Sequence, residues 1–305
     1  SYIGKAITNA CDGIFKTNIE DGQNDQSTQN NQVDTMLAKG ASVVAVSVCD
    51  VTAAPTLIQK CKDAGNVPII FFNKEITDYD VINSYENAYQ VTSTGGDYGA
   101  SIQAQMVIDY WKEHPEMDKN GDGKLQLVYL MGDPGHTASQ PRCDYLKSTI
   151  EDAGIEIDLL AEDTGMWVTA TAKEKMDAWV SKYGDEIECC VAGNDAMALG
   201  ALSAVEAAGF NTDGEESSKY IPIYGIDALP EILSKIESGE ITGSVLQDAK
   251  TQGQTIVKMA ENLTSGKDAV DGIEGVETEE EAKAVRVPYQ AITKDNLDLA
   301  KSTYE

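Results

Sequence analysis

The stretch DKNGDGKLQ at 118–126 carries a potential oxygen ligand at every second position. The donors would be the side chains of Asp118, Asn120, Asp122 and Gln126 and the backbone carbonyl of Lys124. Gly123 stands at the sixth position, where calcium loops of the EF-hand type need a sharp turn. Such a loop closes at its twelfth position with a bidentate Glu, but that position here is Tyr129. The spacing predicts a calcium loop that lacks its closing carboxylate; the alternative is a surface turn rich in Asp, Asn and Gly.

A second pattern consists of polar residues that follow apolar runs, at the points where the chain turns toward a helix. They are Asn73, His136, Asn194, Asp227 and Gln247. In open parallel sheets the ligand crevice lies outside the carboxyl ends of the strands. Any one of these residues could instead be a helix cap or a turn residue. The five together predict a site for a small ligand.

Other kinds of chemistry find few candidates in this chain. It has no glycine-rich phosphate loop and no Ser or Cys nucleophile grouped with His and an acid, and it has only two histidines. The six cysteines show no CxxC pair and no metal-ligand spacing. Cys189 and Cys190 lie in an apolar run, which predicts buried free thiols.

Length and net charge limit the number of domains and the classes of partner that the chain can have. With 305 residues the chain is long enough for two domains. Acidic residues outnumber basic residues by 51 to 23, and a net charge of −28 disfavours nucleic acid and anionic membranes as partners. No apolar run approaches the roughly 20 residues of a membrane-spanning helix, and no targeting segment is visible at the start.

Apolar runs alternate with amphipathic helical stretches along the chain. The runs predict buried parallel strands at 42–48, 67–75, 125–136, 186–195, 221–228 and 241–248. Helical spacing appears at 28–39, 53–64, 96–113, 140–153, 170–182, 195–208 and 249–265. This alternation predicts an α/β fold with two doubly wound parallel sheets. Since SYIGKAITNACDGIF at 1–15 indicates a helix with no strand before it, we expect the first strand to be missing.

Several segments resemble the bacterial galactose/glucose-binding receptors of ABC importers. They are DGQNDQSTQNNQVDTMLAKG, VPIIFFNKE, DKNGDGKLQ, GDPGH, DTGMWVTATAKEKMDAWVS, AGNDAMALGA, YGIDALPE and VRVPYQAITKDNL. The resemblance runs in register from about residue 1 to the C-terminus and implies a periplasmic-binding-protein fold of type I, in which three crossovers form a hinge. It implies an N-terminal domain at 1–91 plus 249–287, and a C-terminal domain at 92–248 plus 288–305. The sugar is expected between the two domains, which close on it.

The resemblance also supplies the missing calcium ligand. In these receptors a Glu from a distant strand closes the loop, and the matching residue here is Glu188. With Asp118 and Asp122 it would give three carboxylates in an all-oxygen shell, which suits Ca²⁺. A loop tied to a remote strand implies a structural role for the ion.

The sugar site carries over by the same resemblance. Trp167 matches a tryptophan that stacks on the sugar ring, and Arg142 matches an arginine that serves two oxygens. The remaining matches are hydroxyl contacts at Asn73, His136, Asn194, Asp227 and Gln247. Lys74 is a weaker candidate, for which the alternative role is to orient its loop.

The sequence departs from these receptors at three places. The opening strand, whose following loop brings an acidic contact and a second stacking aromatic, is not seen before Ser1. Ala138 replaces an aspartate that accepts the anomeric hydroxyl, which should cost about 1.5–3 kcal/mol of binding to a free sugar. We therefore expect a shift toward sugars substituted at the anomeric carbon. Gln247 replaces an Asn and moves the amide outward.

The resemblance implies an extracytoplasmic, monomeric receptor that captures galactose, glucose or a small galactoside. Its partners would be an ABC permease and a chemoreceptor, and it would lie in a periplasm or on a cell surface as a lipoprotein. The alternative is the effector domain of a transcriptional regulator, which an acidic chain with a calcium loop disfavours. A sugar-active enzyme would need two carboxylates at set distances, and Asp227 and Asp248 do not establish such a pair.

Overall fold

The computed structural model describes residues 2–93, 96–215 and 217–304. The chain forms two compact units, one from 1–94 and 248–288 and the other from 95–247 and 289–305. It therefore passes between the units three times. The resemblance implied passages at about 91, 248 and 287.

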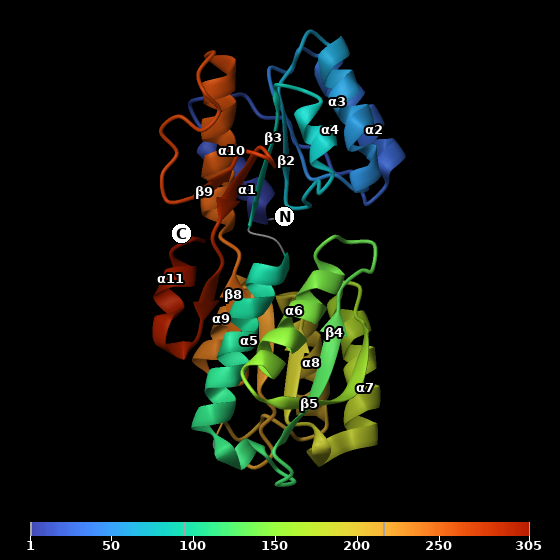
Figure 1. Ribbon diagram of the computed structural model, residues 1–305, viewed down its shortest axis with the longest axis vertical. Helices are drawn as coiled ribbons and strands as arrows, with labels where there is room; N and C mark the ends of the chain where they lie inside the picture. The colour runs from blue at the N-terminus through green and yellow to red at the C-terminus, as the bar shows by residue number, and fades with distance from the viewer. Residues whose placement is uncertain (1, 94–95, 216, 305) are drawn as a thin grey trace. The chain divides into compact units, whose positions relative to one another are not determined.

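The first unit is a five-stranded sheet in the order β1-β2-β3-β10-β9. Figure 1 labels its strands β2, β3 and β9. Neighbouring strands run parallel except for β9, which is antiparallel to β10. The strands are β1 (Val44–Val46), β2 (Ile69–Phe72), β3 (Ala88–Ser93), β9 (Glu277–Glu279) and β10 (Ala284–Val287). The helices are α1 (Tyr2–Ala10), α2 (Gln26–Ala38), α3 (Ala54–Asp63), α4 (Tyr79–Asn83) and α10 (Ala249–Thr264).

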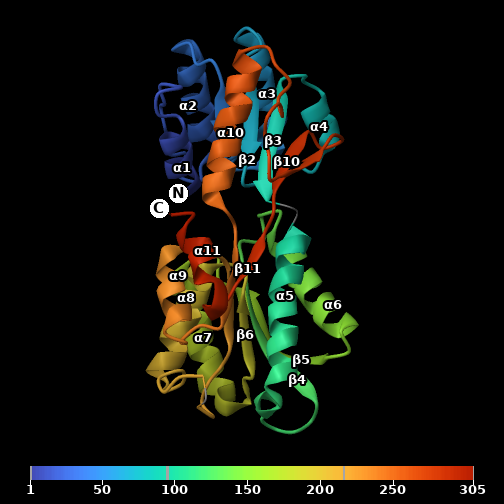
Figure 2. The ribbon, with the colours of Figure 1, turned by 90° about the vertical axis from the view of Figure 1, so that its left-hand side faces the viewer.

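Both faces of this sheet are covered. Helices α2, α3 and α4 pack on one face around Leu57 and Phe71, and α1 and α10 pack on the other around Ile256 and Val285. Figure 2 shows α1 alongside α10. The two helices approach closely because residue 253 of α10 is glycine; an added Cβ would come within 2.7 Å of the backbone of Ala6.

The second unit is a six-stranded sheet in the order β11-β8-β7-β6-β4-β5, parallel except for β11. The strands are β4 (Lys124–Met131), β5 (Glu156–Thr164), β6 (Cys189–Ala192), β7 (Ile223–Asp227), β8 (Gly243–Leu246) and β11 (Gln290–Ile292). The helices are α5 (Gly96–Glu113), α6 (Ser139–Asp152), α7 (Thr169–Tyr183), α8 (Asp195–Ala207), α9 (Pro230–Glu237) and α11 (Leu297–Lys301). Short 3₁₀ turns lie at Val51–Ala53, Pro115–Met117, Gly184–Glu186 and Lys294–Asn296.

The central strands of this sheet are buried on both faces, as expected for a parallel sheet between two helical layers. Residues of α5 and α6 form a core on one face, and residues of α7, α8, α9 and α11 form a core on the other. Cys189 belongs to the first core and Cys190 to the second, because successive strand residues point to opposite faces. Both are free thiols, as predicted, and burial raises the pKa of Cys190 to about 12.

The α/β class and all six expected strands are confirmed, but the sequence missed several elements. Strands β3, β5, β9, β10 and β11 and helices α4, α9 and α11 were not foreseen. The first helix is shorter than the expected 1–15 and ends at Ala10. Strand β1 forms one edge of its sheet, and the expected strand before Ser1 lies outside the described residues.

The described residues contain no helix that combines the length and the apolar character needed to cross a membrane.

Candidate functional site

Polar residues gather at one edge of the second unit's sheet. Strands β8, β7, β6 and β4 are parallel neighbours, so their carboxyl ends meet at that edge. Asp227 ends β7, Gln247 follows β8, Asn194 comes shortly after β6, and His136 lies in the turn after β4. The structure therefore brings these four predicted residues to the same edge, as the sequence pattern indicated.

Asn194 is also a helix cap, which was the alternative role considered from the sequence. Its Oδ1 accepts a hydrogen bond from the backbone N–H of Met197 at 3.0 Å, in the first turn of α8. The cap fixes the orientation of the side-chain amide, so the amide nitrogen is held at the carboxyl edge of the sheet. Capping and ligand binding are compatible here.

Trp167 lies over two glycines at the ends of β4 and β6. A Cβ added at Gly132 would meet the indole Cζ2 at 2.0 Å, and one added at Gly193 would meet Cζ3 at 3.2 Å. The His136 ring meets the indole edge-on, with 5.3 Å between the ring centroids. Met166 and Trp167 both have positive φ values, +56° and +62°, which residues other than glycine rarely adopt. Such strain is typical of ligand sites and persists only where the surroundings impose it.

Arg142 lies at the start of α6 and is only 6% exposed. Its Nη1 donates to the carbonyl oxygen of Gly193 at 2.5 Å and its Nη2 donates to the hydroxyl of Tyr289 at 3.2 Å. The guanidinium carbon lies 5.6 Å from the centroid of the Trp167 ring. Both Arg142 Nε and Trp167 Nε1 are buried and have no hydrogen-bond partner in the described structure. Two unpaired buried donors in one place fit a ligand that brings oxygen acceptors.

Asp227 is the acidic residue among those predicted for this site. Its φ is +128°, and the next residue, Ala228, has a φ of +52°. Burial raises the pKa of the Asp227 carboxyl to about 6, and the positive charge of Arg142 opposes that rise. A carboxylate in this position can accept hydrogen bonds from two ligand hydroxyls.

Ala138 lies at the N-cap of α6, beside this cluster. Its backbone N–H donates to His136 Nδ1 at 3.1 Å, and its side chain makes no capping bond. The position that the resemblance expects to hold a carboxylate therefore carries only a methyl group. A methyl group offers no acceptor and is smaller than the side chain of an aspartate.

The first unit holds the other two predicted residues at the carboxyl end of β2. Asn73 is exposed, has a φ of +68°, and its Nδ2 lies 3.5 Å from Ser47 Oγ. Lys74 Nζ donates to the backbone carbonyl of Cys49 at 2.6 Å. Lys74 therefore ties the loop after β1 to the loop after β2, which agrees with the weaker, orienting role considered for it. The expectation that Asn73 contributes to the ligand stays a prediction.

The loop at 118–126 folds back on its own backbone. Asp118 accepts hydrogen bonds from the N–H groups of Asp122 and Gly123, and Asp122 accepts one from Lys124. Gly123 has a φ of +76°, the left-handed turn that a calcium loop needs at its sixth position. The local turn is therefore of the predicted kind.

Glu188 reaches this loop from the other side. It precedes β6 and is only 1% exposed; its carboxylate accepts from the backbone N–H groups of Lys119 at 2.6 Å and Gln126 at 3.0 Å. Burial raises the pKa of the Glu188 carboxyl, and these hydrogen bonds oppose that rise. Hydrogen bonds thus join Glu188 to loop residues at least 62 positions away in the sequence. That Glu188 is a calcium ligand stays a prediction.

The ligands proposed for calcium are all oxygen atoms, which suit a hard cation, but their arrangement does not form a metal site. In the parts of the chain that the structure describes, no three His, Cys, Asp or Glu side chains are grouped to hold a metal ion. The carboxylates of Asp118, Asp122 and Glu188 instead take backbone N–H donors. The side-chain oxygen of Gln126 is buried without a hydrogen-bond partner, which is the observation that favours a cation at this place.

Sequence reasoning missed four residues that support the edge: Gln103, Asp195, Tyr289 and Ser244. Gln103 Nε2 donates to the carbonyls of Ala192 and Gly225, which ties the ends of β6 and β7 to α5. Asp195 is fully buried beside Asn194. The one available signal was this charge, placed directly after a predicted site residue and before an apolar helix.

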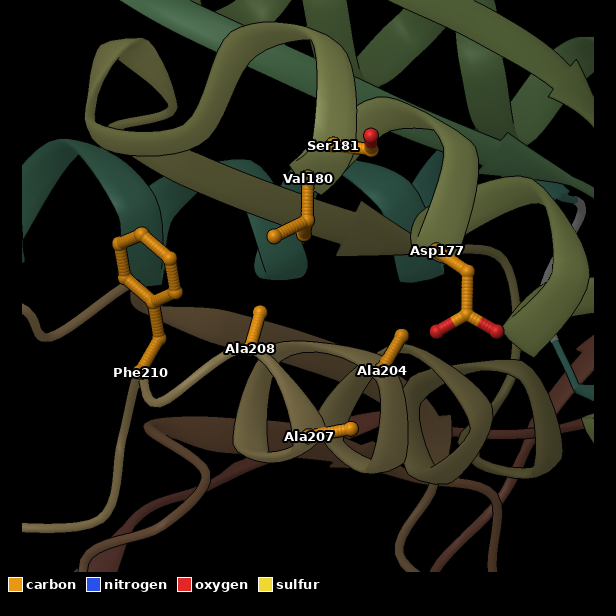
Figure 3. Close-up of a pocket in the computed structure, with 7 residues that line it drawn as sticks. All are labelled: Asp177, Val180, Ser181, Ala204, Ala207, Ala208 and Phe210. Atoms are coloured by element: carbon orange, nitrogen blue, oxygen red, sulfur yellow. The ribbon is translucent and has the colours of Figure 1, made fainter.

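A hollow of about 340 Å³ lies elsewhere, between the later turns of α7 and α8 (Figure 3). It is lined by Asp177, Val180, Ser181, Ala204, Ala207, Ala208 and Phe210. None of the predicted site residues is among them. Since Asn194 caps the opposite end of α8, this hollow lies roughly 15 Å or more along the helix from the polar edge.

Known proteins resemble this chain over most of its length. Residues 2–268 match the model of a family described as the periplasmic binding protein domain. The chain is 43% identical over 286 residues to the D-galactose/methyl-galactoside binding periplasmic protein MglB of Haemophilus influenzae, covering 93% of this chain and 82% of that protein. It is 29% identical over 301 residues to a putative rhizopine-binding protein of Rhizobium meliloti, covering 96% and 87% of the two chains.

Solved structures give the same fold. An ABC transporter solute binding protein from Bacillus halodurans with bound myo-inositol superposes with a TM-score of 0.78 at 27% identity, covering 99% of this chain and 93% of that one. A galactofuranose binding protein superposes with a TM-score of 0.77 at 20% identity, covering 99% and 92%.

Proposed function

This chain belongs to the periplasmic binding protein family, and we propose that it is an extracytoplasmic receptor that binds galactose or a small galactoside for an ABC importer. The 43% identical relative is named for binding galactose and methyl-galactoside, and the solved relatives are solute binding proteins. It releases its ligand unchanged. An ABC permease is the partner that this role requires, and a chemoreceptor is a second one.

The observation that carries this proposal is the group formed by Trp167, Arg142 and Asp227. An indole face covers the apolar C–H side of a pyranose, while hydroxyls at the ring's rim need both donors and acceptors. Arg142 has an unpaired buried Nε and Trp167 an unpaired buried Nε1, so donors are available. Asp227 supplies the acceptor. One flat apolar face with polar groups around it fits a sugar better than an anion or an apolar ligand.

Ala138 refines the ligand class. A free sugar carries a hydroxyl at its anomeric carbon, and without a carboxylate at position 138 that hydroxyl loses a charged acceptor. A glycoside has no hydrogen to donate there and needs space instead. We therefore expect a methyl or larger β-galactoside to bind at least as tightly as free galactose.

The loop at 118–126 with Glu188 is the proposed site of a structural calcium ion. The ligands would be Asp118, Asn120, Asp122, the carbonyl of Lys124, Gln126 and Glu188. Bound there, Ca²⁺ would supply the positive charge that offsets three carboxylates and would link the loop to the residue before β6. Support comes from the unpaired buried oxygen of Gln126 and from the loop's left-handed Gly123.

The proposal is tested by calorimetry with two tryptophan variants. Trp167→Ala should weaken galactoside binding about tenfold to a hundredfold, because it removes about 1.5–3 kcal/mol of apolar contact with the sugar. Trp179→Phe is the control: Trp179 lies in α7 and packs against the core, so its variant should bind as the wild type does. Equal affinity of wild type and Trp167→Ala would refute the proposed site.

A further inference from the structure

Asp195, the first residue of α8, is a fully buried carboxylate that the site described above does not use. Its Oδ2 accepts a hydrogen bond from the backbone N–H of Leu229 at 2.7 Å. Its Oδ1 accepts one from the hydroxyl of Ser244 at 2.6 Å, and that hydroxyl accepts from the backbone N–H of Ala228 at 3.1 Å. One carboxylate thus holds, directly or through one hydroxyl, both N–H groups that follow Asp227.

The backbone at this turn needs such support. Asp227 and Ala228 both have positive φ values, +128° and +52°, and neither is glycine. Backbone in these regions costs free energy and persists only where surrounding contacts fix it. The hydrogen bonds of Asp195 and Ser244 reach this turn from α8 and β8.

Burying the carboxylate of Asp195 costs free energy. A carboxylate buried beside a second carboxylate is unfavourable, and burial together with the charge of Asp227 raises the pKa of Asp195 well above its ordinary value. Space for it exists because residue 225 is glycine; an added Cβ would lie 2.2 Å from Asp195 Oδ1. Asp195 is thus a buried acid beside Asp227, the acid that is proposed to contact the ligand.

We propose that Asp195 is a positioning residue for ligand binding: it fixes the turn after β7 so that the carboxylate of Asp227 points into the sugar site. Asp195 acts through the backbone of residues 228 and 229 and does not touch the ligand. This inference rests on the proposed function, since Asp227 can be positioned for a sugar only if a sugar binds.

The test compares Asp195→Asn with the wild type. The variant keeps the size of the side chain, but an amide has one acceptor oxygen where a carboxylate has two. It therefore cannot accept hydrogen bonds from both Leu229 and Ser244. Affinity for methyl β-galactoside should fall about tenfold to a hundredfold. Amide hydrogen exchange at Ala228 and Leu229 should become faster. Ser244→Ala, which removes only the link to Ala228, should show a smaller loss of affinity and faster exchange at Ala228.

The matched control is Asn211→Ala. Asn211 is also buried and also holds a turn, by accepting from the N–H of Ile221 at 2.8 Å and donating to its carbonyl at 2.9 Å. Ile221 precedes β7, so this turn lies at the amino end of the strand that Asp227 ends. The control should lower the free energy of unfolding and leave ligand affinity unchanged.

The outcomes separate the two proposals. Normal affinity in Asp195→Asn with unchanged exchange at both amides would overturn the positioning role. Equal loss of affinity in Asp195→Asn and Asn211→Ala would also overturn it, because the effect would then be one of general stability. If the wild type binds none of the sugars, the proposed function fails. The exchange measurement then still decides whether Asp195 holds the turn.

Discussion

Trp167 and Gly132 are placed so that the indole occupies the space where a side chain at residue 132 would begin. An added Cβ would lie 2.0 Å from Cζ2 and 2.2 Å from Cε2, far inside van der Waals contact. Gly132 directly follows β4, so the end of the strand forms the floor under the ring. The position of the proposed stacking surface is therefore set by the absence of one Cβ.

Gly132→Ala should displace the indole and weaken sugar binding about tenfold or more, because the ring must move by more than an ångström. Calorimetry measures the affinity, and a thermal melt checks the fold. Gly135→Ala is the control in the same turn, since the nearest atom to its Cβ would be Asp133 Oδ1 at 3.4 Å, an ordinary van der Waals contact. The explanation fails if both variants bind alike.

Sugar affinity should depend on pH through Asp227. Because the pKa of this carboxyl is raised to about 6 by burial, the folded protein without ligand favours the protonated form. The raised pKa of Asp227 therefore adds to the free energy of unfolding at pH below about 4, and this contribution is lost as pH rises through 6. Ligand hydroxyls prefer the ionised form, so affinity should rise with pH up to about 6 and level off above it.

At pH 5 only about a tenth of the Asp227 carboxyl would be ionised, which predicts roughly tenfold weaker binding than at pH 7.5. A calorimetric series from pH 4.5 to 8 measures this, and Asp227→Asn should give a weaker, flat profile. A flat profile in the wild type would show that Asp227 does not accept from the ligand.

Calcium should stabilise the protein through Glu188. Any ion that binds the folded chain alone adds stability by mass action, about 2.7 kcal/mol at a hundredfold excess over its Kd. The melting temperature should therefore rise from chelator to millimolar calcium. Glu188→Gln should abolish most of that rise, and Glu186→Gln, an exposed neighbour, should retain it. An equal rise in both variants would assign the effect to another place.

Asn73→Gly tests the contribution of the first unit. Asn73 has a φ of +68°, which glycine adopts without strain, so the variant removes the side chain and keeps the backbone. We expect binding about tenfold weaker with little change in stability. Asn66→Gly is the control, because Asn66 also has a positive φ, +62°, in an exposed turn of the same unit. Unchanged binding by Asn73→Gly would remove residue 73 from the site.

Strands such as β2 and β6 could be foreseen because an apolar run marks them, and β5 was missed because exposed polar residues interrupt its sequence. The run IIFF of β2 and the run CCVA of β6 are apolar throughout, because helices cover both sides. Strand β5, EIDLLAEDT, is an edge strand with many exposed residues, so no apolar run marks it. The exposure of β5 follows from its position at the edge of the sheet, and that position is a property of the whole sheet and not of the segment.

Strand β10 was hidden for the opposite reason. All four residues of AVRV are buried, including Arg286, which is paired with Glu75 at 2.6 Å and Glu279 at 2.8 Å. A charge in a short segment suggests a surface loop unless its partners are known. Those partners come from 211 and 7 residues away along the chain, and only the folded sheet brings the first of them close.

The residues of the candidate site also fall into those that the sequence predicts and those that it does not. Polar residues at strand ends could be placed from the sequence, because the carboxyl edge of a parallel sheet follows from the strand pattern alone. Asp195 could not be assigned, since its role depends on the turn after β7 and on Ser244 in β8. Contacts between three separate elements leave no local signal.

The most direct test is a calorimetric titration of the wild-type protein, in calcium, with galactose, glucose, methyl β-galactoside and lactose. We predict binding of at least one galactoside, with a glycoside bound no more weakly than free galactose because Ala138 offers space and no charged acceptor. Tighter binding of free galactose than of every glycoside would contradict the role given to Ala138. Binding of none of the four would contradict the central claim that this chain is a galactoside receptor.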